Sequence, residues 1–131
     1  PTDGKWELGT RSPEVMNQDL KERTYQFGLA VVLLLKDNPP PPWAWAMTKQ
    51  LVRCATSVGA NYRASKRGRS PKEFIAKLGT CEEEADECIY WLTLCVDSDY
   101  LPEESASPLI KEANELTAIF VASIKTARAR L

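Results

Sequence analysis

The feature that most constrains the fold is a run of apolar residues whose spacing alternates between four and three. The run consists of Phe74, Leu78, Cys81, Ala85, Cys88, Leu92 and Cys95. This spacing places every one of these side chains on one face of an α-helix, whereas a half-buried strand would need alternation at every second residue. Residues 71–98 are therefore predicted to form a long helix whose apolar seam packs against neighbouring helices.

Four consecutive prolines at positions 39–42 separate a first helix from a second. Proline lacks the amide donor and clashes with the preceding turn, so the helix that starts at Pro13, with Ser12 as its cap, ends near Asn38. Its apolar stripe consists of Leu20, Phe27, Val31 and Leu34. Arg23 and Thr24 interrupt this stripe. The prolines form a stiff spacer about 12 Å long, and a ligand for an SH3-type domain is their functional alternative.

The second helix is predicted from Pro42 or Trp43 to about Lys66. Its apolar stripe consists of Trp43, Met47, Leu51, Cys54 and Val58. The segment Arg67-Gly68-Arg69 ends it. Two independent signals then start the third helix, because a serine at position 70 precedes a glutamate by three residues, as in a capping box, and a proline stands at the first helical position.

The fourth helix is predicted to begin between Pro102 and Pro108, and its apolar residues again recur at steps of three or four. No segment shows the alternation of a strand, and the short connections favour antiparallel neighbours. The predicted fold is all-α, an antiparallel up-down four-helix bundle formed by residues 13–131 and preceded by an irregular lead-in at residues 1–12. A chain of 131 residues has the size of one domain.

The segment from Phe27 to Leu35 indicates a homo-oligomer. Every residue in it is apolar or glycine, although a helix on the outside of an isolated bundle keeps a polar face. A helix that is apolar all round is covered on two sides, and a second subunit would supply the second cover. Trp43, Trp45 and Trp91 are predicted to be core or interface aromatics, and Trp45 points away from Trp43, which fits an intersubunit surface.

The chain contains no histidine, which removes the catalytic arrangements and zinc sites that depend on one. Ser57 therefore lacks a base that would make it a nucleophile, and Ser57 and Asn61 are predicted to satisfy hydrogen bonds across a helix–helix contact. Glu83, Glu84 and Glu87 resemble the carboxylates of di-metal bundles, but those bundles also need Glu-x-x-His motifs. We predict no enzymatic activity, no metal and no cofactor.

Three of the four cysteines repeat every seven residues, at positions 81, 88 and 95. Neighbours in this series are about 10.5 Å apart along a helix axis, too far to share a metal or to bridge one another. Cys54 could approach one of them from the second helix, but a reduced compartment disfavours a disulfide.

A cytoplasmic location without membrane association is predicted. The first twenty residues hold no apolar run of signal-peptide length. The longest apolar run covers nine residues, whereas a helix that spans a bilayer needs about 20.

The formal net charge of -1 conceals two blocks of opposite sign. Residues 49–81 have a local balance of +7, and residues 82–104 have a balance of -9. The basic side chains that cluster around the turn between the second and third helices are Arg63, Lys66, Arg67, Arg69 and Lys72. Arg63 and Arg67 are four residues apart and are predicted to share a helix face.

This basic turn is predicted to neutralise phosphates of structured RNA or DNA without sequence specificity. Aromatic side chains that would stack on single-stranded bases are sparse there, with Tyr62 alone in the cluster. Two alternatives remain, a solvated turn or a face that pairs with the acidic block of a neighbouring subunit. The carboxylates from Glu82 to Asp86 are themselves interpreted as a solvated face or as part of such a pair.

Four short stretches resemble a bacterial family: LVRCATSVGAN at 51–61, SPKEFIAKL at 70–78, EEADE at 83–87 and YWL at 90–92. This is the four-helix-bundle family that includes the proteins encoded by 23S ribosomal RNA intervening sequences. The chain is also similar to the accessory bundle protein of diversity-generating retroelements. The resemblance covers the second and third helices closely and the first and fourth by pattern.

The resemblance implies a bundle that assembles as a ring-like homopentamer and has no known catalytic residues. For the retroelement branch it implies binding of nucleic acid and of a reverse transcriptase through a basic surface. The chain differs from that branch, which is strongly basic overall, and it has YRASK at 62–66 where many members have Ala-Glu-Gly. The predicted function is an oligomeric, non-enzymatic scaffold associated with nucleic acid. The alternative is a structural or protein-interaction module that docks a partner protein.

Overall fold

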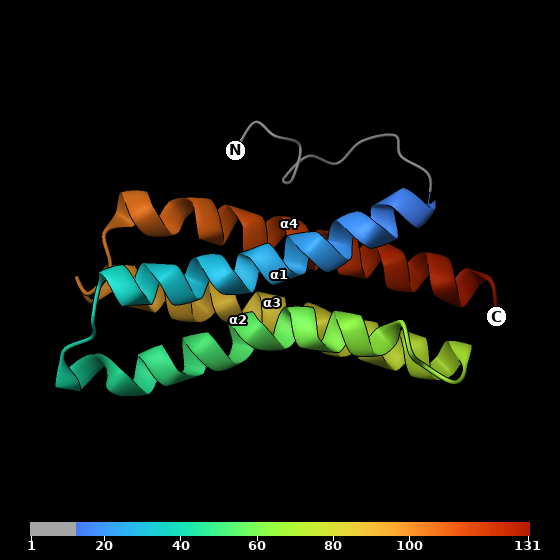
Figure 1. Ribbon diagram of the computed structural model, residues 1–131, viewed down its shortest axis with the longest axis horizontal. Helices are drawn as coiled ribbons and strands as arrows, with labels where there is room; N and C mark the ends of the chain where they lie inside the picture. Colours follow the sequence, from blue (N-terminus) through green and yellow to red (C-terminus); the bar gives the residue numbers. More distant parts are fainter. Residues whose placement is uncertain (1–12) are drawn as a thin grey trace.

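The computed structural model describes residues 13–131, which form four helices packed side by side as a bundle (Figure 1). The helices are α1 (Pro13–Asp37), α2 (Trp45–Ser65), α3 (Pro71–Asp97) and α4 (Glu103–Ala129), and the short 3-10 turn η1 (Pro42–Ala44) precedes α2. The described residues contain no strand. The predicted all-α class with four helices is confirmed, whereas the predicted lead-in at 1–12, with the Ser12 cap, lies outside the described residues. No helix in the described part of the chain combines the length and the apolar character needed to cross a membrane.

The start of α3 follows the capping signals in the sequence. The Oγ atom of Ser70 accepts a hydrogen bond from the Glu73 amide at 3.1 Å, and Pro71 is the first helical residue. The Glu73 carboxylate accepts from the Arg69 amide at 3.1 Å, one residue before the amide that an ideal capping box would use. Both bonds fasten the α2–α3 turn to the first turn of α3.

The start of α2 differs from the prediction. The stripe predicted for this helix began at Trp43, but Trp43 lies in η1 and its side chain is 60% exposed. The prediction was wrong because η1 has 3-10 geometry, with about three residues per turn, so the helical spacing of α2 does not extend back through it. The fourth helix begins at Glu103, inside the predicted interval, and Pro108 lies within it.

The α1–α2 and α3–α4 connections lie at one end of the bundle (Figure 1). The Tyr100 hydroxyl joins them, because it donates a hydrogen bond to the Asn38 carbonyl at 2.6 Å. The Trp43 ring meets the Tyr100 ring edge-on at 6.4 Å between centroids. The α2–α3 turn lies at the other end, together with the start of α1 and the end of α4.

The predicted seam of α3 forms the centre of the core. Its members are at most 1% exposed from Leu78 to Cys95, and Phe74 is half-buried. The helix α3 lies between α2 and α4 and makes its most extensive contacts with these two, whereas the contact between α1 and α4 is much smaller. The first helix therefore depends mainly on α2 for its position.

A buried ion pair joins α1 to α4 across their small interface. The Nε and Nη2 atoms of Arg23 donate to the two carboxylate oxygens of Glu112 at 2.6 and 2.7 Å, and both side chains are 3% exposed. Burial raises the pKa of Glu112 even though Arg23 acts in the opposite direction. The sequence analysis treated Arg23 and Thr24 as an interruption of the apolar stripe, and that was wrong. Both lie on the buried face of α1, where Glu112 compensates the arginine charge.

The backbones of α1 and α2 approach closely at two glycines. A Cβ atom on Gly28 would lie 3.3 Å from the carbonyl oxygen of Ala55, and one on Gly59 would lie 3.3 Å from that of Thr24. These distances are tighter than ordinary van der Waals contact, so a larger residue at either position would push against the backbone of the other helix. In contrast, nothing lies within 4 Å of a Cβ atom built on Gly79 of α3.

We expect removal of one partner of the ion pair to destabilise the protein strongly, and removal of both partners together to change its free energy of unfolding little. Arg23→Met or Glu112→Leu leaves one charge buried and should lower the free energy of unfolding by about 3–5 kcal/mol. The double variant removes both charges and should lie within about 1 kcal/mol of the unmodified protein or above it. Urea denaturation followed by circular dichroism, at one protein concentration, measures all four forms. A double variant as unstable as the two single losses combined would contradict this expectation.

Substitutions at two glycines should distinguish the effect of helix propensity on stability from the effect of close helix packing. Gly79→Ala adds a methyl group in open space and should raise the free energy of unfolding by about 0.5–1 kcal/mol. Gly59→Val puts a branched side chain against the backbone of α1 and should lower it by about 1–3 kcal/mol. Thermal denaturation measures the stability of both variants. If Gly59→Val were as stable as Gly79→Ala, α1 and α2 would not be in close contact at Gly59.

Candidate functional site

The basic turn is held in one conformation by short-range hydrogen bonds. The amides of Arg67 and Gly68 donate to the carbonyls of Ala64 and Ser65 at 3.0 and 3.2 Å. A Cβ atom at position 68 would lie 3.2 Å from that same Ser65 oxygen and 3.3 Å from the Phe74 amide nitrogen, so a larger residue there would crowd the backbone of the turn. With the Ser70 cap on its far side, the turn is anchored to both helices.

All five predicted site residues are exposed at this turn, and four of them make no side-chain contact that fixes them. These four are Arg63, Arg67, Arg69 and Lys72, and within residues 13–131 none of their side chains has an ion-pair or hydrogen-bond partner. The prediction that Arg63 and Arg67 share a helix face was wrong, because α2 ends at Ser65 and Arg67 lies in the turn beyond it. The turn nevertheless concentrates positive charge in a small volume.

Lys66 differs from the other four. Its ammonium lies over the rings of Tyr62 and Phe74, at 5.4 and 5.6 Å from their centroids. Partial burial lowers the pKa of Lys66. The aromatic rings hold this charge against the bundle, so Lys66 is less available to an external anion. Tyr62 itself is 1% exposed and cannot stack on a nucleic-acid base.

The acidic block of α3 is partly neutralised within the same chain. Arg53 of α2 donates to both carboxylate oxygens of Glu84 at 3.1 and 3.0 Å and also forms an ion pair with Glu87. The hydrogen bond from the Trp91 indole to Glu87 lowers the pKa of Glu87, and Arg53 acts in the same direction. The cation that these carboxylates contact is therefore Arg53 and not a residue of the basic turn.

The two ends of the bundle carry opposite charge. The exposed carboxylates of the α3–α4 connection are Asp97, Asp99, Glu103 and Glu104. Trp43 and Trp45 are exposed at this same end. The exposed cations Arg128 and Arg130 at the end of α4 lie at the opposite end, with the basic turn (Figure 1).

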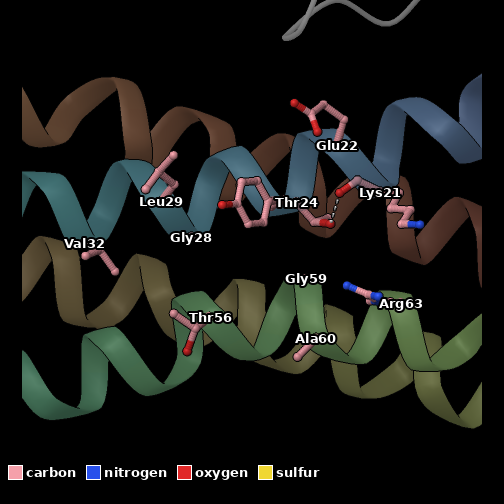
Figure 2. A pocket seen from close by; sticks show the side chains of 11 residues that line it. Lys21, Glu22, Thr24, Gly28, Leu29, Val32, Thr56, Gly59, Ala60 and Arg63 are labelled. Atoms are coloured by element: carbon pink, nitrogen blue, oxygen red, sulfur yellow. Dashed lines mark hydrogen bonds between the residues drawn. The ribbon is translucent and has the colours of Figure 1, made fainter.

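A groove of about 860 Å³ runs between α1 and α2 and ends near the basic turn. Figure 2 shows Leu29 and Val32 of α1 toward one end of it, and Lys21 and Arg63 toward the other. Tyr25, Leu29 and Val32 are 61%, 37% and 39% exposed. Large apolar side chains exposed side by side mark an interaction surface more often than an ordinary protein exterior.

Comparison with known proteins identifies the family. Residues 16–122 match the 23S rRNA-intervening sequence protein family. The chain belongs to this family. It is also similar to the crystal structure of a protein of unknown function from the S23 ribosomal protein family of Bacteroides thetaiotaomicron VPI-5482. The TM-score is 0.77 at 29% identity, and the match covers 83% of this chain and 97% of that one. No curated protein matches the chain.

In this member of the 23S rRNA-intervening sequence protein family, Ser57 and Asn61 have a local role. The Asn61 amide donates to the Ser57 carbonyl at 2.9 Å, inside α2. The expectation of a hydrogen bond across a helix–helix contact was wrong, because the asparagine side chain bonds back to its own helix. Among residues 13–131 no group of three or more cysteine, aspartate or glutamate side chains could hold a metal ion.

The sequence analysis missed two features of this family member's surface. It flagged the segment from Phe27 to Leu35 but not Tyr25, and it did not place Lys21 and Arg63 on the same groove. The available signal was the pair Gly28 and Gly59, small residues that allow two helices to approach closely. The network around Arg53 was also missed, because three acidic residues in a row give no indication of which one faces the neighbouring helix.

Proposed function

We propose that this protein is a non-enzymatic, oligomeric four-helix-bundle scaffold that acts in the cytoplasm and binds structured RNA or DNA through the basic turn. The observation that carries the proposal is the set of four exposed cations without a partner, held on a turn of fixed conformation. When such cations bind the phosphates of a nucleic acid, they displace the counterions condensed on it. This displacement gives affinity without sequence specificity. The buried Tyr62 offers no stacking surface, so duplex or hairpin structures are the preferred ligands.

The antiparallel bundle is the proposed unit of a ring-shaped homo-oligomer, a pentamer, and the α1–α2 groove is its proposed contact. In a ring the groove of one copy contacts a different surface of the next copy, and such a heterologous contact closes when the rotation between copies allows it. A ring repeats the basic turn once per subunit. Several weak phosphate contacts then act together at a high effective concentration.

A second proposed function is a protein-interaction module that docks a partner, such as a reverse transcriptase, without binding nucleic acid. The observation that favours it is the outer face of α3, where Tyr90 is exposed and meets the Trp91 ring edge-on at 4.9 Å. Exposed acidic residues flank this aromatic pair, among them Asp86. The nucleic-acid binding assay described next separates the two functions, because the second predicts no binding.

Charge reversal at the basic turn should weaken nucleic-acid binding. The variant Arg67→Glu/Arg69→Glu/Lys72→Glu leaves Arg63 in the groove untouched. We expect its affinity for a fluorescein-labelled RNA hairpin to fall about tenfold or more at low salt, and its logarithmic salt slope to become shallower by about 2–3. Fluorescence anisotropy across a salt series measures both quantities.

The matched control carries Lys36→Glu, Lys49→Glu and Lys111→Glu, three exposed cations outside the turn. This control changes the net charge by the same amount and should keep most of the affinity. The nucleic-acid proposal fails if the unmodified protein shows no salt-dependent binding. It also fails if the control loses as much affinity as the turn variant.

A charge placed in the groove should dissociate the oligomer. Val32→Glu and Leu29→Glu put a carboxylate on the apolar surface of α1 and should convert an assembly of about five subunits into a 14.7 kDa monomer. Light scattering after size exclusion gives the mass, and circular dichroism confirms that the helices persist. Val121→Glu, on an exposed position of α4, is the control and should remain assembled. An unmodified protein that is monomeric at micromolar concentration would contradict the ring.

A further inference from the structure

Two buried thiols from different helices are in direct contact. The Sγ atoms of Cys54 on α2 and Cys88 on α3 are 3.2 Å apart, and both residues are fully buried. The Cys88 thiol donates to the Cys54 sulfur, and the Cys54 thiol lies 3.4 Å from the Leu51 carbonyl oxygen, to which it donates. The two sulfurs are thus aligned by a short chain of hydrogen bonds.

The other two cysteines provide an internal comparison. Cys81 and Cys95 lie one heptad before and after Cys88 on the same face of α3, and both are fully buried. The Cys81 thiol donates to the Val58 carbonyl at 3.6 Å. Among the residues that the structure describes, the pair of Cys54 and Cys88 is the only one with a sulfur–sulfur contact.

We propose that Cys54 and Cys88 are a redox-sensitive pair that a two-electron oxidant, such as a peroxide, converts into a disulfide joining α2 to α3. A disulfide bond is about 2.05 Å long, so the sulfurs must approach by about 1.2 Å. Rotation of the two cysteine side chains and a small change in the spacing of α2 and α3 have to supply this approach. The α2–α3 turn already holds the two helices together.

The reaction balances with a peroxide as oxidant. One sulfur attacks a peroxide oxygen, the O–O bond breaks, and the products are a sulfenic acid and one molecule of water. The second sulfur then displaces the hydroxyl group of the sulfenic acid, the S–S bond forms, and a second molecule of water leaves. The two thiols lose two electrons and two protons in total, and hydrogen peroxide is reduced to two waters.

Proximity, and not thiol acidity, selects the pair. Burial raises the pKa of Cys81 to about 12 and that of Cys95 to about 11. The hydrogen bond to Cys54, together with burial, raises the pKa of Cys88. None of these three thiols is activated, so oxidation is slow and proceeds when the α2–α3 interface opens transiently. A sulfur oxidised in this way has a resolving partner only at the Cys54–Cys88 contact.

The disulfide would close the loop of chain that carries the basic turn. A cross-link between residues 34 positions apart restricts the unfolded chain, so the oxidised protein should melt about 10 °C above the reduced one. This inference does not depend on nucleic-acid binding, because it concerns the helix pair behind the turn.

The test is a thiol count on the native protein after oxidation. The unmodified protein is treated with hydrogen peroxide or diamide, with and without urea below the unfolding transition, then denatured, alkylated with N-ethylmaleimide and weighed by mass spectrometry. We expect two alkylated thiols instead of four, a peptide that links Cys54 to Cys88, faster cross-linking in urea and a higher melting temperature. Four free thiols under both conditions, a different linkage or a lower melting temperature would each overturn the proposal.

Cysteine variants provide matched controls. The double variant Cys81→Ala/Cys95→Ala keeps the pair and should form the cross-link at the same rate, within about twofold. Cys54→Ala and Cys88→Ala each remove one partner and should abolish the intramolecular cross-link. Peptide mapping of the unmodified chain decides the question even if one of these variants fails to fold.

Discussion

The contact of the α3 seam with α2 on one side and α4 on the other is the interaction on which the rest of the structure depends. These two interfaces are the most extensive in the bundle, and α1 then packs mainly on α2. Helix α1 therefore has little apolar contact with α4, and the buried bond between Arg23 and Glu112 fixes their relative position. The groove lies on the other side of α1, where Gly28 and Gly59 line it and Tyr25, Leu29 and Val32 remain exposed.

Local and periodic features of the structure could be predicted from the sequence. The cap at Ser70 and the seam of α3 depend on residues within a few positions of each other, and both are present. The burial of Arg23 could not be predicted, because a charged residue on an apolar face is tolerated only with a partner, and Glu112 is 89 positions away. Trp43 was misplaced because one turn of 3-10 geometry shifts every side chain that precedes α2.

The residues of the candidate site could be predicted from the sequence, but the contacts of their side chains could not. Five basic residues around one turn are evident in the sequence, yet only the structure shows that Lys66 lies over two aromatic rings while the other four have no such contact. It also shows that Glu84 and Glu87 of the acidic block form ion pairs with Arg53 of the same chain. Family membership adds a related structure but no assigned activity. The proposed function therefore rests on the charges, the groove and their exposure.

The separation of charge between the two ends of the bundle gives the molecule an electric dipole along its long axis. The carboxylates of the α3–α4 connection form its negative pole, and the basic turn with Arg128 and Arg130 forms its positive pole. The electric field of a polyanion orients such a dipole before contact, so the positive end of the molecule faces the polyanion. If the copies in an assembly are parallel, one face of the particle attracts phosphate and the opposite face, with Trp43 and Trp45, repels it.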